Sequence, residues 1–340
     1  MSKFPFRFGI IGAGAIAQAY ATSIEQIPHV ALTAVCDMDL ANAARMAQGH
    51  GAEVFSSHRD MIDAQICDGV LVATPPVTHA PIVVELLSKK MPVLCEKPLS
   101  VDLESAKRMI NAAEDQDTLL SMASKFRFSD DVIKARDLIR DGAIGTPLML
   151  ENTFTGVVDM TSRWNSDKTV SGGGVLIDNG THSVDIIRFL VGPIEDVFAV
   201  PAPRIQNVDV EDGVTLLART ETGVEAKVET SWSIHKDRTA AIEVYGTTGA
   251  IEVGWKSSRI RRQHGGAWEE FGSGYDKIAS FRRQVEHFVG ALGGDQLELV
   301  DTEDALASVS AIQAAYASIQ SGTWVKVGTG TYEVPKFKLA

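Results

Sequence analysis

The chain has 340 residues, of which 45% are hydrophobic and 22% charged, and its formal net charge is −12. This length predicts two domains rather than one. The negative charge argues against nucleic acid and anionic membrane surfaces as partners, because both are bound through basic patches. The sequence opens with no basic and apolar signal and holds no apolar stretch long enough to cross a bilayer, so we expect a cytoplasmic protein.

The cysteines are Cys36, Cys67 and Cys95, an odd number, and each lies in an apolar, strand-like segment. This placement predicts buried free thiols in a reducing compartment rather than disulfides. The sequence contains neither a CxxC nor an HExxH spacing, and we expect no metal site.

A short apolar run at 8–11 is followed at once by glycines in the string RFGIIGAGAIAQ. Gly12 allows a tight turn out of a strand, Gly14 lets a pyrophosphate approach the backbone, and Ala17 lets the next helix pack closely on the sheet. The backbone of Ala15 and Ile16 opens that helix, whose free N–H groups attract an anion. The pattern predicts a dinucleotide site.

A second apolar strand at 31–36 ends at Asp37. An acid at this distance after the glycines can accept hydrogen bonds from both hydroxyls of the adenosine ribose, and it repels a 2′-phosphate. This favours NAD as cofactor, with NADP as the alternative. A purely structural interpretation is that Asp37 caps the next helix, which Asp39 could do equally well.

Strands and helices alternate through the first part of the chain, which predicts a doubly wound parallel sheet. The predicted helices cover 39–48, 59–64, 81–89 and 102–115, and the further strands cover 54–55, 69–73, 92–95 and 119–123. After the strand at 69–73, the segment Thr74, Pro75, Pro76, Val77, Thr78, His79 exposes backbone at the carboxyl edge, where open sheets bind ligands. We expect Thr74, Pro75 and His79 to contact the cofactor.

From about Ser124 onward, the alternation of short strands and helices ends and longer strands are predicted. A helix is predicted at 129–140, amphipathic helices at 276–292 and 302–321, a hairpin turn at 246–249, and a strand followed by irregular chain at 323–340. The predicted strands cover 148–155, 197–200, 214–219, 225–231, 241–245 and 250–253. Ala226 and Val228 alternate with Lys227 and Glu229, so this sheet has one buried and one more polar face, and the polar face suits a partner subunit.

Glu96, Lys97 and Pro98 end the strand at 92–95, where a nicotinamide ring would lie. Pro98 stops the strand from continuing. We expect Glu96 and Lys97 to contact the cofactor, although a solvated lysine at a strand end is the commoner arrangement.

Three glycines at 172–174 lead into an apolar-periodic helix that carries Asp178, His182 and Asp185 on one face. Histidine suits proton transfer near neutral pH, and a neighbouring carboxylate can orient its ring. The alternative is an ordinary surface Asp–His pair. Loop residues that could line a pocket for a hydroxylated substrate are Lys125, Arg127, Arg163, Trp164 and Lys168, each of which could equally be an ordinary loop residue.

Taken together and in order, these segments resemble the Gfo/Idh/MocA oxidoreductase family. The resemblance rests on GIIGAGAIA, Asp37, ATPPVTHA at 73–80, CEKPLS at 95–100, SKFRF at 124–128 and GGGVLIDNGTHSVDIIRFL at 172–190. It implies a Rossmann domain, which we assign to 1–123, and a C-terminal α+β domain at 124–340 with an open, mainly antiparallel sheet. Many members pair as dimers or tetramers through that sheet.

By motif, Lys97 resembles the family's lysine at the reacting hydroxyl and nicotinamide, and Asp178 and His182 resemble its D-x-x-x-H pair. SKFRF replaces an asparagine-containing form of relatives, so the substrate cannot be carried over. The resemblance implies an NAD(P)-dependent dehydrogenase acting on a sugar, inositol or sugar derivative, with Lys97, Asp178 and His182 as catalytic residues. The alternatives are an NADPH-dependent keto-sugar reductase and a nucleotide-sensing regulator without turnover.

Overall fold

The computed structural model describes residues 5–328, and these residues form two compact units. Among the described residues, the first unit contains 5–100, 104–128 and 276–305, and the second contains 101–103, 129–275 and 306–328. The sequence-based division at 123/124 therefore differs from the observed one, because the segment 276–305 returns to the first unit. No helix in the described part of the chain is both long and apolar enough to span a membrane.

The first unit is built on a six-stranded parallel sheet with the order β3-β2-β1-β4-β5-β6. Its strands are β1 (Phe6–Ile11), β2 (Val30–Cys36), β3 (Glu53–Phe55), β4 (Gly69–Val72), β5 (Val93–Glu96) and β6 (Leu120–Ala123). The strand order reverses between β1 and β4, and a crevice for a ligand forms at the carboxyl edge of such a switch point. The predicted doubly wound sheet is confirmed.

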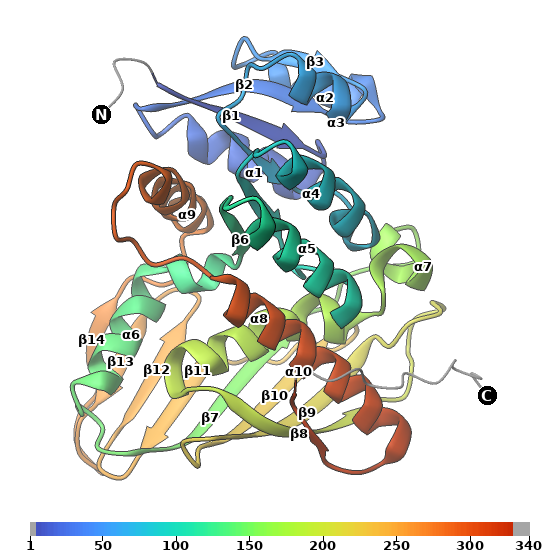
Figure 1. Ribbon diagram of the computed structural model, residues 1–340. Coiled ribbons are helices and arrows are strands. Elements are labelled where there is room, and N and C mark those ends of the chain that lie inside the picture. Colours follow the sequence, from blue (N-terminus) through green and yellow to red (C-terminus); the bar gives the residue numbers. More distant parts are fainter. Residues whose placement is uncertain (1–4, 329–340) are drawn as a thin grey trace. The chain divides into compact units, whose positions relative to one another are not determined.

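Helices connect these strands (Figure 1). They are α1 (Ala15–Ile24), α2 (Leu40–Ala47), α3 (His58–Asp63), α4 (His79–Ser88) and α5 (Leu103–Asp115), with short 3-10 turns at Pro76–Thr78 and Lys125–Phe128. Because crossovers between parallel strands are almost always right-handed, we expect α1 and α2 on one face of the sheet and α4 and α5 on the other.

A helix from the far end of the chain, α9 (Lys277–Leu292), packs on α1. Phe281 and Phe288 of α9 are completely buried, and the ring centroid of Phe281 lies 4.1 Å from that of Tyr20. Phe288 meets Phe8 of β1 edge to face. Burial of these aromatic side chains explains why α9 joins the first unit although it follows the second unit's sheet in the sequence.

The second unit contains a nine-stranded sheet with the order β14-β13-β12-β11-β7-β10-β9-β8-β15. Its strands are β7 (Pro147–Thr155), β8 (Ile194–Pro201), β9 (Gly213–Thr220), β10 (Glu225–Ser231), β11 (Ala240–Gly246), β12 (Ala250–Gly254), β13 (Ser258–Arg261), β14 (Glu269–Gly272) and β15 (Val325–Lys326). The β7–β10 pair is parallel and the other pairs are antiparallel, as expected of a mainly antiparallel sheet. The sequence analysis missed β13 and β14, because four-residue strands rich in arginine and glutamate show little hydrophobic alternation.

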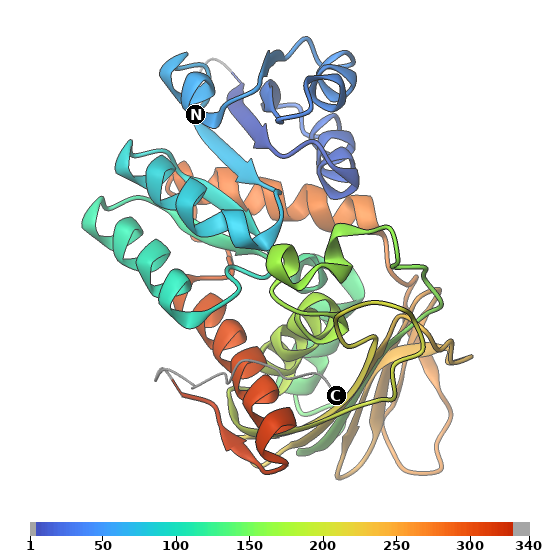
Figure 2. The same ribbon diagram turned by 90° about the vertical axis from the view of Figure 1, so that its right-hand side faces the viewer.

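Helices cover one face of this sheet (Figures 1 and 2). They are α6 (Asp130–Arg140), α8 (Val175–Val191) and α10 (Thr302–Ser321). The short helix α7 (Lys168–Ser171) instead contacts the 3-10 turn at Trp164–Ser166. Among the described residues, no helix lies on the opposite face in either view. Ala226 and Val228 are buried while Lys227 and Glu229 are half-buried, so the predicted two-faced sheet is present. The predicted irregular chain after 328 lies outside the described residues.

Candidate active site

The glycine turn between β1 and α1 has the geometry that a phosphate site needs. Gly12 has a φ of +95°, and a Cβ atom there would lie 2.7 Å from the carbonyl oxygen of Ala73, so only glycine fits. Gly14 is exposed, and a Cβ there would meet no atom within 4 Å. Gly14 also begins α1 without a side-chain cap, so the N–H groups of Ala15 and Ile16 remain available for an anion.

The carboxylate of Asp37 is directed at this turn. Its Oδ2 accepts a hydrogen bond from the N–H of Ala13 at 2.6 Å, and its Oδ1 accepts one from Asp39 at 2.8 Å. Asp39 caps α2, since its side chain accepts hydrogen bonds from Ala41 and Asn42. Asp39 and not Asp37 is therefore the residue that caps α2. Asp37 lies beside the glycine turn, where an adenosine ribose would bind. These residues fit a bound dinucleotide.

The segment after β4 lies at the same carboxyl edge. The Thr78 hydroxyl donates to the carbonyl oxygen of Pro75 at 2.7 Å and lies 2.8 Å from the Thr74 hydroxyl. Thr74 and Pro75 are half-buried at this edge, consistent with backbone exposed to a ligand. His79 differs from the prediction: its side chain is completely buried, and its ring nitrogens face the carbonyl oxygens of Pro98 and Thr74. Its imidazole therefore cannot touch a cofactor.

Glu96 and Lys97 end β5 at this edge, and the Lys97–Pro98 peptide bond is cis. Glu96 is buried; its Oε1 accepts from the Tyr20 hydroxyl at 2.8 Å and its Oε2 from the N–H of Lys97 at 3.0 Å. Burial raises the pKa of Glu96, and the nearby Lys97 and Lys125 partly offset that rise. Lys97 is half-buried. The Glu96 carboxylate thus fixes the backbone of the lysine next to it.

Lys125 and Arg127 lie on the 3-10 turn that follows β6. The Lys125 ammonium is 5.3 Å from the ring centroid of Phe126 and 5.9 Å from that of Phe281. Arg127 is buried and forms an ion pair with Asp304 at 2.5 Å. The structure thus places Lys125 on aromatic rings and gives Arg127 a structural partner that the sequence analysis did not foresee.

In the second unit, α8 carries Asp178 and His182 one turn apart. Asp178 is half-buried, His182 is 7% exposed and Asp185 is completely buried. The i, i+4 spacing of Asp178 and His182 puts both on one helix face, as predicted.

The start of α8 is fixed by Glu211, which no local sequence signal identifies. Its Oε1 accepts hydrogen bonds from the N–H groups of Gly174 at 2.9 Å and Leu176 at 3.1 Å, and from the Tyr316 hydroxyl at 2.8 Å. A Cβ at Gly173 would lie 2.0 Å from the Tyr316 oxygen, which explains the glycine there. Burial raises the pKa of Glu211, while the Tyr316 hydroxyl opposes the rise.

Arg163 and Trp164 are exposed on the loop after β7. That loop is anchored by Gln206, whose Oε1 accepts from the N–H of Met160 at 2.9 Å and whose Nε2 donates to the carbonyl oxygen of Val158 at 2.9 Å. Lys168 is exposed at the start of α7. The structure therefore leaves these side chains at the surface of the second unit, on a loop with a defined anchor.

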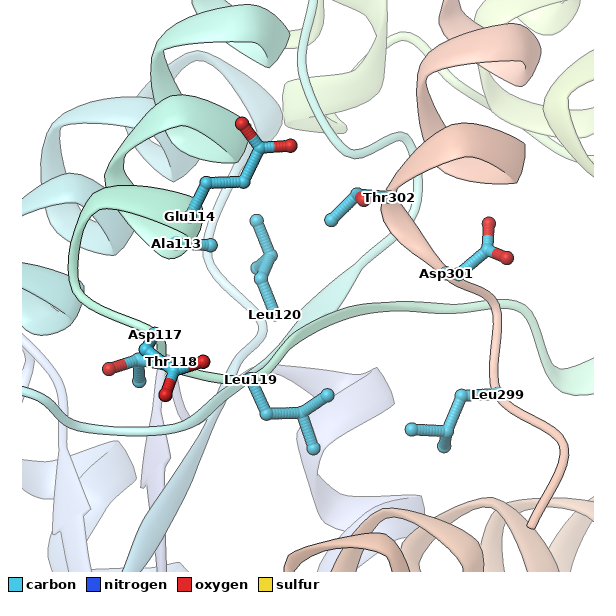
Figure 3. A pocket seen from close by; sticks show the side chains of 9 residues that line it. All are labelled: Ala113, Glu114, Asp117, Thr118, Leu119, Leu120, Leu299, Asp301 and Thr302. Atoms are coloured by element: carbon cyan, nitrogen blue, oxygen red, sulfur yellow. The ribbon is translucent and has the colours of Figure 1, made fainter. Parts of the chain in front are cut away.

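A hollow of about 440 Å³ lies at the start of β6 (Figure 3). Leu119, Leu120 and Leu299 form its apolar part, and Glu114, Asp117 and Asp301 bring carboxylates to it. It is a poor dinucleotide site, because it lies at the amino end of the strand and three carboxylates repel a pyrophosphate. Within residues 5–328, no group of three or more His, Cys, Asp or Glu side chains could hold a metal ion.

Comparison with known proteins gives matches along most of the chain. A family model described as "Oxidoreductase family, NAD-binding Rossmann fold" (GFO_IDH_MocA) matches residues 6–124, and the GFO/IDH/MocA C-terminal domain matches residues 132–252. The inositol 2-dehydrogenase of Rubrobacter xylanophilus is 28% identical over 94% of this chain and 93% of its own length. That of Rhizobium meliloti is 30% identical over 72% of this chain and 74% of its own.

Among solved structures, GenD2 from gentamicin A biosynthesis, in complex with NAD, is 26% identical and has a TM-score of 0.85. The match covers 96% of this chain and 97% of that one.

Proposed function

The chain belongs to the GFO/IDH/MocA family of NAD-binding oxidoreductases, and on that premise we propose a dehydrogenase that transfers hydride between NAD and a secondary alcohol of a cyclic polyol or sugar. The observation that carries the proposal is the convergence of the uncapped glycine turn, Asp37 and Lys97 at the carboxyl edge of one parallel sheet. This edge offers an anion site, a ribose acceptor and an ammonium group together.

Asp37 supports NAD rather than NADP as the working cofactor. Its carboxylate beside the glycine turn suits the ribose hydroxyls as donors and would repel a 2′-phosphate. This speaks against the alternative of an NADPH-dependent keto-sugar reductase.

Bound NAD would accept the hydride. Side chains of the protein would accept the proton of the substrate hydroxyl and stabilise the negative charge that develops on its oxygen. We assign His182 as the base that accepts the hydroxyl proton, since imidazole titrates near neutral pH. Lys97 would stabilise the negative charge that develops on the same oxygen. Asp178 would bind a neighbouring hydroxyl or orient His182, and buried Asp185 is the other candidate for orienting it.

Lys125, Arg163 and Trp164 are proposed as substrate contacts. Ring faces and charged donors suit the apolar faces and hydroxyl groups of polyols. Arg127, which the sequence analysis placed in this group, would contribute only by holding Asp304.

We also propose a homodimer or homotetramer formed through the open face of the second unit's sheet. Charged side chains lie opposite one another on neighbouring strands of this sheet, namely Lys227, Glu151, Glu243, Glu252 and Arg259. Arg238 bridges Glu151 at 3.0 Å and Glu243 at 2.7 Å. Sedimentation velocity of the purified protein tests this directly, and a monomer at micromolar concentration would contradict it.

The function is tested with a panel of inositols and sugars, both cofactors, and the absorbance of reduced nicotinamide as readout. Single-turnover oxidation by Lys97→Ala and His182→Ala should then be slower than wild type by about 10²-fold or more. Lys89→Ala and His264→Ala, at exposed positions, serve as matched controls. Rates near wild type in both test variants would refute the assignment.

A further inference from the structure

His79 joins two turns that are distant in the sequence. Its side chain has no solvent exposure; its Nδ1 lies 3.0 Å from the carbonyl oxygen of Pro98, and its Nε2 lies 2.8 Å from that of Thr74. Thr74 follows β4 and Pro98 follows β5, and these strands are neighbours in the parallel sheet. The ring therefore bridges two adjacent connections at the carboxyl edge.

The His79 ring fills space between the two connections and also provides a hydrogen-bond donor to a buried carbonyl oxygen. An apolar side chain of the same volume would leave the buried carbonyl oxygen that accepts the ring N–H without a donor, which is costly. Burial lowers the pKa of His79, which favours the neutral ring with a single N–H donor. One of the two carbonyl oxygens is then the acceptor, and the other faces a ring nitrogen without a hydrogen.

We propose that His79 is a positioning residue for Lys97 and that it carries its single ring hydrogen on Nδ1, from which it donates to the carbonyl oxygen of Pro98. Pro98 directly follows Lys97, so a donor at Nδ1 restrains the backbone from which the Lys97 side chain extends. This inference depends on the proposed function, because it assumes that Lys97 acts on the substrate. It replaces the direct cofactor contact predicted for His79, which complete burial excludes.

Two near-isosteric substitutions separate the two contacts. The amide nitrogen of Asn in His79→Asn lies near the position of Nδ1 and keeps a donor for Pro98, whereas that of Gln in His79→Gln lies near Nε2 and keeps a donor for Thr74. His79→Ala removes both. Each amide variant keeps one buried donor and one hydrogen bond to a carbonyl oxygen, so their melting temperatures should be similar.

The expected result is a difference in kcat at similar stability. The kcat of His79→Gln and His79→Ala should fall by about 10- to 100-fold, because a small misplacement of a catalytic group is costly, while His79→Asn should stay within about threefold of wild type. The KM for NAD should change little in His79→Asn and His79→Gln. Equal kcat values in these two variants would overturn the proposal.

A second measurement needs no turnover. Competitive acetylation of the lysines, followed by mass spectrometry, reports the reactivity of Lys97 relative to exposed Lys89 in each variant. The ratio should shift at least about twofold in His79→Gln and stay at the wild-type value in His79→Asn. An unchanged ratio in both His79→Gln and His79→Ala would contradict the proposal even if no substrate is found, whereas failure of the polyol screen alone would contradict only the proposed function.

Discussion

The hydroxyl of Tyr20 lies 2.8 Å from Oε1 of Glu96, although the two residues are 76 positions apart in the chain. Tyr20 belongs to the helix that follows the glycine turn, and Glu96 directly precedes Lys97. The same hydroxyl lies 3.1 Å from Oε1 of Gln284 on α9. One hydroxyl hydrogen serves one of these two oxygens at a time, and that of Glu96 is the nearer. The contact between Tyr20 and Glu96 therefore connects the helix after the glycine turn to the end of β5, which Lys97 follows.

Burial of Glu96 makes stability depend on pH. Because the pKa of Glu96 in the folded state is raised above its ordinary value of 4.5, its contribution to stability is complete below that pH and is lost as pH rises through the folded pKa. Glu96→Gln lacks this titration. Its unfolding free energy relative to wild type should therefore rise with pH above 4.5, by at most about 1.4 kcal/mol per pH unit.

Urea denaturation of both proteins at several pH values between about 4 and 8 measures this difference. Tyr20→Phe keeps the ring on Phe281 and the Glu96 carboxyl but removes the hydrogen bond that lowers the pKa of Glu96, so its unfolding free energy relative to wild type should fall as pH rises, the opposite of Glu96→Gln. A difference between Glu96→Gln and wild type that does not vary with pH would contradict the prediction.

Substitutions of Gly14 and Gly12 should separate cofactor binding from folding. In Gly14→Ala, the added methyl group meets no protein atom within 4 Å, so the unfolding free energy should change by less than about 1 kcal/mol. The methyl group would occupy the space of the pyrophosphate, and NAD affinity measured by calorimetry should fall at least about tenfold.

Gly12→Ala is expected to destabilise the fold itself. It combines a φ of +95° with a contact of 2.7 Å to the carbonyl oxygen of Ala73. The cost should exceed about 1 kcal/mol of unfolding free energy. Wild-type NAD affinity in Gly14→Ala would place the phosphate site elsewhere.

Asp37 should control the choice between NAD and NADP. Asp37→Ala removes the ribose acceptor and the charge that repels a 2′-phosphate, so the ratio of kcat/KM for NAD to that for NADP should fall about tenfold or more. Asp39→Ala is the control, because Asp39 caps α2 and its loss should cost about 1 kcal/mol of stability without changing the ratio. An equal shift in both variants would show that Asp37 has no specific role.

Glu211 should determine the order at the start of α8. Glu211→Ala leaves the N–H groups of Gly174 and Leu176 without this acceptor, and we expect a loss of about 1–2 kcal/mol in unfolding free energy. Hydrogen exchange should accelerate at 174–178, next to Asp178. Tyr316→Phe, which removes only one hydrogen bond to the same carboxylate, should have a smaller effect on both measurements. Unchanged exchange in Glu211→Ala would contradict this role.

Local sequence patterns determined the parallel sheet, the glycine turn and the helix that carries Asp178 and His182. Each of these depends on residues close together in the chain: an apolar strand that ends in glycine, or an i, i+4 spacing on a helix. The local pattern at Asp37 left two roles open, and the structure chose between them because Asp39 occupies the cap of α2.

Only the tertiary structure decided which distant groups meet. His79 faces Pro98, Glu211 caps α8, Arg127 pairs with Asp304, and α9 packs on α1 across most of the sequence. None of these contacts leaves a periodic or compositional trace, because a buried carboxylate, imidazole or guanidinium takes its partner from whichever segment the fold brings within hydrogen-bonding distance. The sequence by itself determined which chemistry each segment offers, and folding determined which of those groups face a ligand and which support a neighbour, because burial depends on contacts made across the whole chain.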